Sequence, residues 1–188
     1  MNKDILFWQT EGINYLRWYT GPEYYEGEEN VKATVELVGQ GPMRDLGCGY
    51  GRLARNFLPE NYVGYDICEA AVRKANMLNP SYTFHHWDSQ PVVPAETTLF
   101  ANGPHLVNDE DIDHMLDVMC DGTQVIVIAE LMGREHRKIP YIYGVYHRDL
   151  EEYDEMLAMR GFSRTDAKVG THLRLERPYT VARWKRDA

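Results

Sequence analysis

The sequence has few cysteines, no surplus of positive charge and no long hydrophobic run. Its cysteines, Cys48, Cys68 and Cys120, are odd in number and form no C-x-x-C pair, which argues against a complete disulfide framework. We therefore expect a reducing, cytoplasmic setting. The N-terminal region lacks a basic segment followed by an apolar run, so a signal peptide is not expected, and no stretch approaches the length of a membrane span.

The charge balance limits the partners that the chain is expected to bind. Its 20 Lys and Arg residues are outnumbered by 29 Asp and Glu residues, which gives a net charge of −9. Because phosphate binding depends mainly on Lys and Arg, neither nucleic acid nor an anionic membrane is an expected partner. The 188 residues suffice for one domain, 1–188, with a sizeable core, and no repeat, low-complexity tract or linker divides them.

What the sequence does contain is a glycine-rich turn between two predicted elements. The stretch 43–52 predicts a short strand, a tight turn and the start of a helix, with the letters D-L-G-C-G-Y-G at its centre. The glycines at alternate positions, Gly47, Gly49 and Gly51, leave little side-chain bulk and tolerate φ > 0, so a ligand can approach the backbone. Residues 52–58 then predict a helix. Strand, glycine turn and helix form the nucleotide-binding corner of a doubly wound α/β sheet.

A second acid lies at the distance that this corner requires. The segment 61–67 predicts the next strand, and Asp66 within it follows Gly47 by nineteen positions. In nucleotide-binding α/β folds an acid at about that distance ends the second strand and accepts the ribose hydroxyls, since a carboxylate takes two O–H donors at once. The alternative is that Asp66 only N-caps a helix over about 69–78.

The spacing G-x-G-x-G, directly preceded by an acid and Leu, resembles motif I of the class I S-adenosylmethionine-dependent methyltransferases. Dinucleotide-binding folds use G-x-G-x-x-G instead, so a nicotinamide-dependent oxidoreductase is disfavoured. The resemblance implies S-adenosylmethionine as the cofactor. It also implies a set of cofactor-binding residues: Asp45, Gly47, Cys48, Gly49 and Gly51 in the motif, Asp66 and Ile67 at the end of the second strand, and Asp88 at the end of a third strand over 82–88.

The resemblance also gives roles to the acids in this set. Asp45 would position nearby amide or ammonium groups, and Asp66 would hold the ribose. Members of the family often carry an acid at the place of Asp88, facing the adenine amino group. For Asp88 the alternative is a simple turn residue.

The letters N-G-P-H, from Asn102 to His105, follow a fourth predicted strand over 97–102. In family members that methylate amino groups of nucleic acids, this position holds Asn or Asp followed by Pro-Pro and an aromatic residue, and the Asn grips the target amine. This chain has Gly and His at two of those places, which leaves the role of Asn102 open. His105 is a candidate general base, because an unperturbed histidine titrates near neutrality, or a hydrogen-bonded structural residue. No metal site is predicted, since the adjacent His85 and His86 point to opposite faces of a strand.

The remaining patterns complete one α/β domain. They predict helices over 30–38, from about 109 and over 148–160, and strands over 123–129, 162–169 and 179–184. We therefore expect a Rossmann-like, doubly wound fold with helices on both faces of a mostly parallel, seven-stranded sheet, and the resemblance implies an antiparallel strand near one edge. Arg44 stands where the family has an apolar residue, so either the strand is short or Arg44 finds a partner at the sheet's edge.

These patterns predict methyl transfer to a small molecule, with Asn102 and His105 as catalytic candidates. Basic residues within 131–147 would suit an anionic acceptor, and the aromatic segment 1–30 either packs on the domain or forms a lid over the ligand. Two alternatives remain: a catalytically inactive methyltransferase-like binding or scaffold protein, and an amino-methyltransferase acting on nucleic acid or protein.

Overall fold

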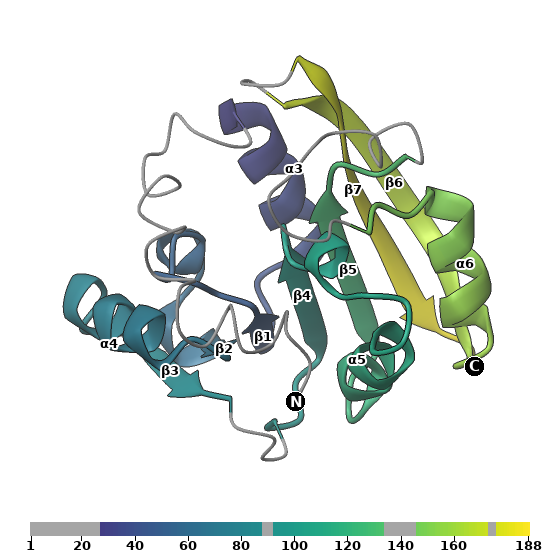
Figure 1. Ribbon diagram of the computed structural model, residues 1–188. Coiled ribbons are helices and arrows are strands. Elements are labelled where there is room, and N and C mark those ends of the chain that lie inside the picture. Colours follow the sequence, from purple (N-terminus) through teal and green to yellow (C-terminus); the bar gives the residue numbers. More distant parts are fainter. Residues whose placement is uncertain (1–26, 88–91, 134–145, 173–175) are drawn as a thin grey trace.

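One seven-stranded sheet forms the centre of the computed structural model, which describes residues 27–87, 92–133, 146–172 and 176–188 (Figure 1). The strands are β1 (Met43–Leu46), β2 (Tyr62–Asp66), β3 (Thr83–His86), β4 (Thr97–Ala101), β5 (Val125–Glu130), β6 (Phe162–His172) and β7 (Arg177–Arg186). The α-helices are α3 (Gly27–Val38), α4 (Glu69–Leu78), α5 (Ile112–Cys120) and α6 (Leu150–Ala158). Within these described residues, no helix combines the length and the apolar character that crossing a membrane requires.

The strand order across the sheet is β3-β2-β1-β4-β5-β7-β6. Strands β1 to β5 pair in parallel, whereas β7 pairs antiparallel with both β5 and β6. The order reverses between β1 and β4, which is the point where doubly wound sheets bind ligands. The seven strands and the antiparallel strand near one edge confirm the expectation, but the β6–β7 hairpin makes the sheet mixed, which corrects the expectation of a mostly parallel one.

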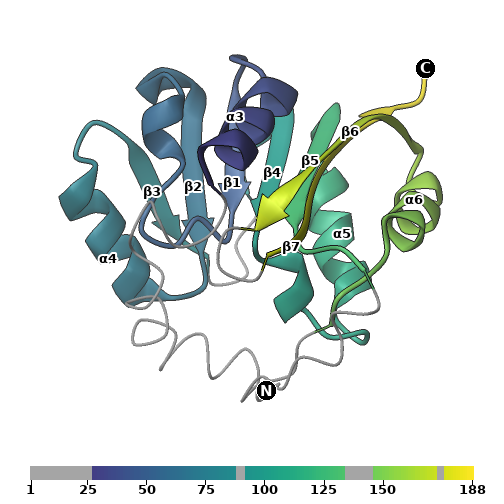
Figure 2. The same ribbon diagram turned by 90° about the horizontal axis from the view of Figure 1, so that it is seen from above.

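Strand β5 shows why both faces of the sheet are covered. All six of its residues are buried, and their side chains alternate between two separate cores. Val125 and Val127 pack in the core that includes residues of α3 and α4, and Ile126 and Ile128 pack in the core that includes residues of α5 and α6. Figure 2 shows the helices on the two sides of the sheet. A strand buried on both faces explains the near-continuous β-branched run in the sequence.

The predicted helix over 52–58 is wrong. The glycine turn leads instead into two short 3₁₀-helices, η2 (Ala54–Asn56) and η3 (Pro59–Asn61). Pro59 accounts for the difference, because a proline disfavours the α conformation of the residue before it, and Leu58 is extended with φ −71° and ψ 136°. The segment between the glycine turn and the proline is short, so it forms too few helical hydrogen bonds to offset the cost of nucleating an α-helix.

Arg44 lies in the interior of the sheet and not at its edge. Strand β1 sits between β2 and β4, and the Arg44 side chain is fully buried. Its guanidinium donates to Thr98 Oγ1 at 2.8 Å and to four backbone oxygens at 2.6–3.0 Å, those of Val93, Val118, Met119 and Asp121. Three of these oxygens lie at the end of α5, so Arg44 satisfies the C-terminal carbonyls of that helix. Burial lowers the pKa of Arg44. The other expectation, a short strand, is confirmed, since β1 has four residues.

Candidate functional site

The carboxyl ends of β1, β2, β4 and β5 lie along one edge of the sheet, because neighbouring strands in this group pair in parallel. Several of the predicted site residues come together there from separate parts of the chain. Asp45 and the glycine loop (residues 47–51) lie at the end of β1, Asp66 ends β2, and Asn102 and His105 follow β4. Open α/β sheets bind their ligands at this kind of edge.

The glycines of the glycine loop are needed for its backbone and for its packing. Gly47, Gly49 and Gly51 have φ of +70°, +54° and +70°, a conformation that side chains other than glycine rarely adopt. A Cβ atom on Gly47 would lie 2.9 Å from the ring of Phe100, and one on Gly51 would lie 2.4 Å from the ring of Phe84. Close packing against these rings therefore accounts for two of the glycines, beside the ligand approach that the sequence predicts.

Hydrogen bonds hold the glycine loop against the neighbouring strand and helix. The Cys48 amide donates to Tyr65 O at 3.0 Å, and Asn79 Nδ2 donates to Tyr50 O at 3.1 Å. Asn79 directly follows α4 and Tyr65 lies in β2. The loop is therefore fixed from both β2 and α4, although no α-helix follows it.

Asp66 joins the glycine loop to the start of α4. Its Oδ2 accepts the amide of Gly49 at 2.8 Å, and its Oδ1 accepts the amide of Cys68 at 2.8 Å. Burial raises the pKa of Asp66, and these two amides oppose that rise. Cys68 is the residue before the first helical position, so Asp66 braces the turn that precedes α4 rather than only capping the helix. The carbonyl of the next residue, Ile67, accepts from His86 Nε2 at 3.1 Å.

Asp45 is buried beside the same loop. Its Oδ2 accepts the hydroxyl of Tyr62 at 2.7 Å. Burial and then Asp45 raise the pKa of Tyr62, so the phenol keeps its proton and remains the donor. Burial, and then Asp66 and Asp45, also raise the pKa of the Cys48 thiol well above its usual range. Cys48 is therefore a small protonated packing residue and not a nucleophile.

Asn102 turns the chain away from the sheet. Its backbone is left-handed, with φ of +54°, and its amide donates to Ala129 O at 2.8 Å. Asn tolerates this conformation better than most residues do. The left-handed backbone is therefore enough to explain an Asn at position 102, without a catalytic role.

One aromatic ring connects the glycine loop to the segment that carries His105. The Phe100 ring lies next to Gly47, and a Cβ atom on Gly103 would lie 1.8 Å from the same ring. Gly103 is two residues before His105, which lies in the 3₁₀-helix η4 (Pro104–Leu106). The glycine loop and the His105 segment are therefore neighbours, with the Phe100 ring in contact with both.

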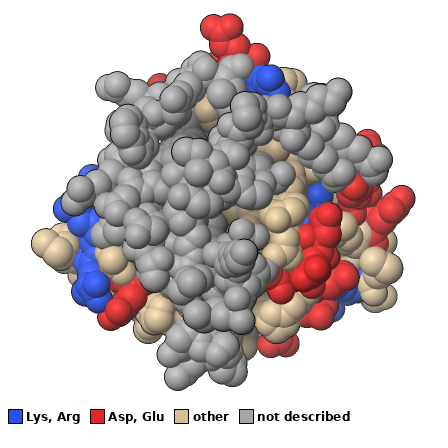
Figure 3. Space-filling model, viewed as in Figure 1, with Lys and Arg blue, Asp and Glu red and all other residues tan. Residues whose placement is uncertain are grey.

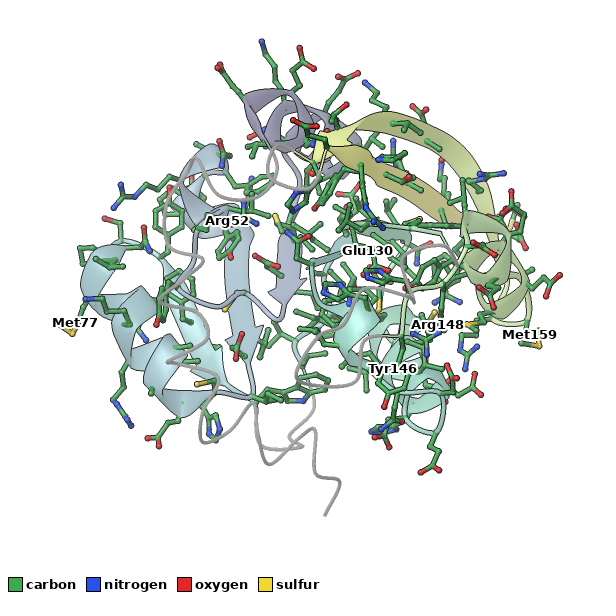
Figure 4. All side chains as sticks on the ribbon, turned by 45° about the horizontal axis from the view of Figure 1, so that its top comes forward. Arg52, Met77, Glu130, Tyr146, Arg148 and Met159 are labelled. Carbon is green, nitrogen blue, oxygen red and sulfur yellow. The ribbon has the colours of Figure 1, made fainter. Side chains whose placement is uncertain are left out.

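A buried carboxylate at the end of β5 binds His105. Glu130 Oε2 lies 2.9 Å from the His105 amide and 3.0 Å from His105 Nδ1, and Glu130 Oε1 accepts the Tyr153 hydroxyl at 2.5 Å. The His105 ring stacks on that of His147, with centroids 5.2 Å apart and planes 10° apart. Arg148 lies beside this group, and Figure 4 shows Glu130 near the centre of the molecule with Arg148 and Tyr146 on one side of it. We name Glu130, His105, Tyr153, His147 and Arg148 the Glu130 cluster.

No protein-family model matches the sequence, and a search of curated proteins found no match. Solved structures do match the fold. Magnesium protoporphyrin IX methyltransferase from Synechocystis PCC 6803 with bound SAH has a TM-score of 0.78 and 14% identity, and the match covers 98% of this chain and 100% of that chain. Human N-acetylserotonin methyltransferase in complex with SAM has a TM-score of 0.69 and 18% identity, over 97% of this chain and 58% of that chain. The N-methyltransferase NodS from Bradyrhizobium japonicum, in complex with S-adenosylhomocysteine, has a TM-score of 0.73 and 11% identity, over 96% and 99% of the two chains.

This chain has the class I methyltransferase fold. Strand order, the antiparallel β7 and the glycine loop after β1 agree with that identification. Of the residues that the family resemblance assigns to the cofactor, the structure places Asp45, Gly47, Cys48, Gly49, Gly51, Asp66 and Ile67 together at the carboxyl ends of β1 and β2. Asp88, the segment 1–26 and the basic residues within 134–145 lie outside the described residues, so their predicted roles stay predictions.

Glu130 is the residue of this candidate site that sequence reasoning missed. The sequence predicts a strand over 123–129, but the acid that follows it was not among the predicted site residues. The signal was present, because Asp66 also ends its strand at the same edge of the sheet. Tyr153 lies within the predicted helix over 148–160, and its hydrogen bond to Glu130 depends on how α6 packs. Among the described residues, no group of His, Cys, Asp or Glu has the composition of a metal site.

Proposed function

We propose that this protein transfers a methyl group from S-adenosylmethionine to a small molecule. The observation that carries the proposal is the bracing of Asp66 against the glycine loop at the carboxyl ends of β1 and β2. It sets a buried carboxylate at the place where the methyltransferase fold would hold an adenosyl ribose. The cofactors in the similar solved structures support the same assignment.

The residues at this edge fit the cofactor. A carboxylate offers about four acceptor positions, and two are used by the amides of Gly49 and Cys68, which leaves others for two ribose hydroxyls. The glycine loop would border the methionine part, with Asp45 behind it, and Asp88 would face the adenine. When bound, the cofactor supplies a methyl group made electrophilic by the positive sulfur. The protein's task is to align the acceptor and to exclude water.

The acceptor we propose is a small molecule. Magnesium protoporphyrin IX methyltransferase and N-acetylserotonin methyltransferase, two of the similar structures, are named for small-molecule acceptors. The net charge of −9 disfavours a nucleic acid. Figure 3 shows acidic side chains gathered over α5 and α6. Both helices carry exposed acids, Asp113 and Asp117 on α5 and Glu151 on α6. The basic residues between 134 and 138 would favour an anionic acceptor.

One observation favours a second candidate, a protein that binds without catalysing. The α-helix expected after the glycine loop is replaced by the single turn of η2 (Ala54–Asn56). The amides at the start of an α-helix, and its dipole, are therefore not available next to this loop. A chain that kept the fold without the cofactor would tolerate this change.

Thermal unfolding with and without ligand separates the two candidates. S-adenosylhomocysteine at a hundredfold excess over its dissociation constant should stabilise the protein by about 2.7 kcal/mol and raise its melting temperature, whereas NAD should not. Incubation with a radiolabelled methyl donor and a panel of small acceptors then tests catalysis. A shift with NAD and none with S-adenosylhomocysteine would contradict the proposal. Absence of S-adenosylhomocysteine binding, or cofactor binding with no labelled product from any acceptor, would favour the binding protein.

A further inference from the structure

The Glu130 cluster is built around one buried carboxylate, whose hydrogen-bond donors come from two other elements. The side chain of Glu130 is fully buried and accepts three donors, the His105 amide, His105 Nδ1 and the Tyr153 hydroxyl. A buried charge is stable only when its acceptor positions are satisfied in this way. Three elements supply the group: β5 carries Glu130, η4 carries His105 and α6 carries Tyr153.

The hydrogen-bond pattern fixes the position of the proton on His105. The His105 amide can only donate, and burial raises the pKa of Tyr153, as does Glu130 next to it, so the phenol also keeps its proton and donates. Both Glu130 oxygens thus act as acceptors, and the remaining contact, from His105 Nδ1 at 3.0 Å, is satisfied when Nδ1 carries the hydrogen. A neutral His105 ring of this form has a lone pair on Nε2.

The cluster also holds the His105 ring in place. His147 Nδ1 donates to Leu131 O at 2.7 Å, which fixes the ring that stacks on His105. Arg148 donates to Pro104 O at 3.3 Å and to Val107 O at 3.1 Å, on either side of His105. The His105 side chain keeps 19% of its surface exposed, whereas Glu130 has none, and the described part of the chain gives Nε2 no hydrogen-bond partner.

The backbone around His105 is fixed as well. The Tyr146 amide donates to His105 O at 2.7 Å, and the His105 amide is the donor already bound by Glu130. Through the contacts of Phe100 with Gly47 and Gly103, this fixed segment lies next to the glycine loop. The ring is therefore positioned on the edge of the sheet where the proposed cofactor binds.

We propose that Glu130 is a positioning residue that holds His105 with its proton on Nδ1, so that Nε2 serves as the general base toward an acceptor bearing a hydroxyl group. This inference rests on the proposed function. The acceptor's O–H bond breaks and its proton goes to Nε2. The oxygen keeps that electron pair and forms the new O–C bond to the methyl group, while the electrons of the old S–C bond stay on sulfur. The resulting imidazolium is neutralised by the Glu130 carboxylate, as a carboxylate stabilises a catalytic histidine elsewhere.

Nitrogen NMR of protein labelled in its histidines tests the first part directly. The neutral His105 ring should show a protonated Nδ1 and an unprotonated Nε2 in the wild type. In Glu130→Gln, the Gln side chain also presents an N–H₂ donor, so this tautomer preference should be lost. A wild-type ring protonated at Nε2 overturns the proposal, and this measurement does not depend on whether the variant folds.

Kinetics with a panel of simple phenols and anilines test the second part. Wild-type protein should yield O-methylated phenols, and Glu130→Gln should lower kcat by about a hundredfold with little change in KM or in S-adenosylhomocysteine affinity. In a His105→Ala background, Glu130→Gln should have no further effect on kcat. The matched control is Asp154→Asn, which removes an acid on α6 whose partners are Trp184 Nε1 at 2.8 Å and Arg164 Nη2 at 3.1 Å.

The outcomes separate this inference from the proposed function. Absence of S-adenosylhomocysteine binding to the wild type overturns the proposed function and the base role with it. With that binding intact, the failure of every phenol to be methylated, or an equal kcat for the wild type and Glu130→Gln, overturns the Glu130 inference alone. A kcat loss from Glu130→Gln that persists in the His105→Ala background also overturns it, because Glu130 would then not act through His105.

Discussion

Replacing Asp66 with Asn perturbs the point where β2, the glycine loop and α4 meet. The wild-type carboxylate accepts two backbone amides at 2.8 Å, from Gly49 and Cys68. An Asn side chain offers one oxygen and turns an N–H₂ group toward the second amide. The variant therefore leaves at least one of these two amides without an acceptor, which costs about 1–3 kcal/mol, and the ligand-free protein should be destabilised by an amount in that range.

The pH dependence of this effect has a definite sign. Burial raises the pKa of Asp66 above its ordinary value of 3.8. A raised pKa in the folded state means that this group's contribution to stability is fully present below the unfolded pKa and is lost as the pH rises through the folded pKa. The advantage of the wild type over Asp66→Asn should therefore decrease as the pH rises from below 3.8 through the raised value. Urea titrations at a series of acidic pH values measure it.

Because the substitution weakens the ligand-free site as well, cofactor affinity alone does not identify a ribose contact. Calorimetry with S-adenosylhomocysteine and its 2′-deoxy analogue isolates that contact. If the carboxylate accepts the 2′-hydroxyl, the wild type should bind the deoxy analogue at least tenfold more weakly, which is about 1.4 kcal/mol. In Asp66→Asn the difference between the two ligands should shrink, because the charged partner of that hydroxyl is gone. The same loss for both proteins would refute the ribose assignment.

The remaining predictions concern packing and charge. In a urea titration, Arg44→Met should lower the free energy of unfolding by about 3 kcal/mol or more, because each buried backbone oxygen left without a donor costs about 1–3 kcal/mol. The control is Arg73→Met, which breaks an exposed surface pair with Glu69 and should cost under about 1 kcal/mol. Gly51→Ala should cost more than Gly161→Ala, because both glycines have left-handed backbones but only Gly51 would crowd a ring; equal losses would show that the Phe84 contact relaxes. A polarisation assay should find no appreciable affinity for duplex DNA at physiological salt, and tight, salt-sensitive binding would contradict the small-molecule proposal.

Much of the fold could be predicted because local patterns and tertiary packing agree. The β-branched run from Val125 is buried on both faces. Gly39 follows the predicted helix over 30–38 and Gly161 follows the one over 148–160, and both have the left-handed backbone of a helix end, with φ of +81° and +74°. The helix predicted over 52–58 is wrong because the spacing of its apolar residues was the only signal used. Pro59 directly follows that segment and acts against a helix in it.

The site was predictable where a motif carries it and not where packing does. The glycine loop and Asp66 are sequence signals with a fixed spacing, and the structure joins them through the Gly49 amide. The second role of Asp66, bracing the ligand-free turn at Cys68, depends on local geometry that spacing does not encode. Glu130 contacts His105, which is 25 positions away in the sequence, and Tyr153, which is 23 positions away. The three residues lie on three different elements, so only the folded chain reveals these contacts.

The central claim is that the glycine loop and Asp66 form a site for an adenosyl cofactor. Titration of ¹⁵N-labelled protein with S-adenosylhomocysteine, followed through the backbone amide signals, tests it most directly. The amides of Gly47, Gly49 and Cys68 should shift and saturate together, since they line or brace the proposed site. NAD at the same concentration should leave them unchanged. Shifts confined to residues away from β1 and β2, or no shift at all with S-adenosylhomocysteine, would contradict the account.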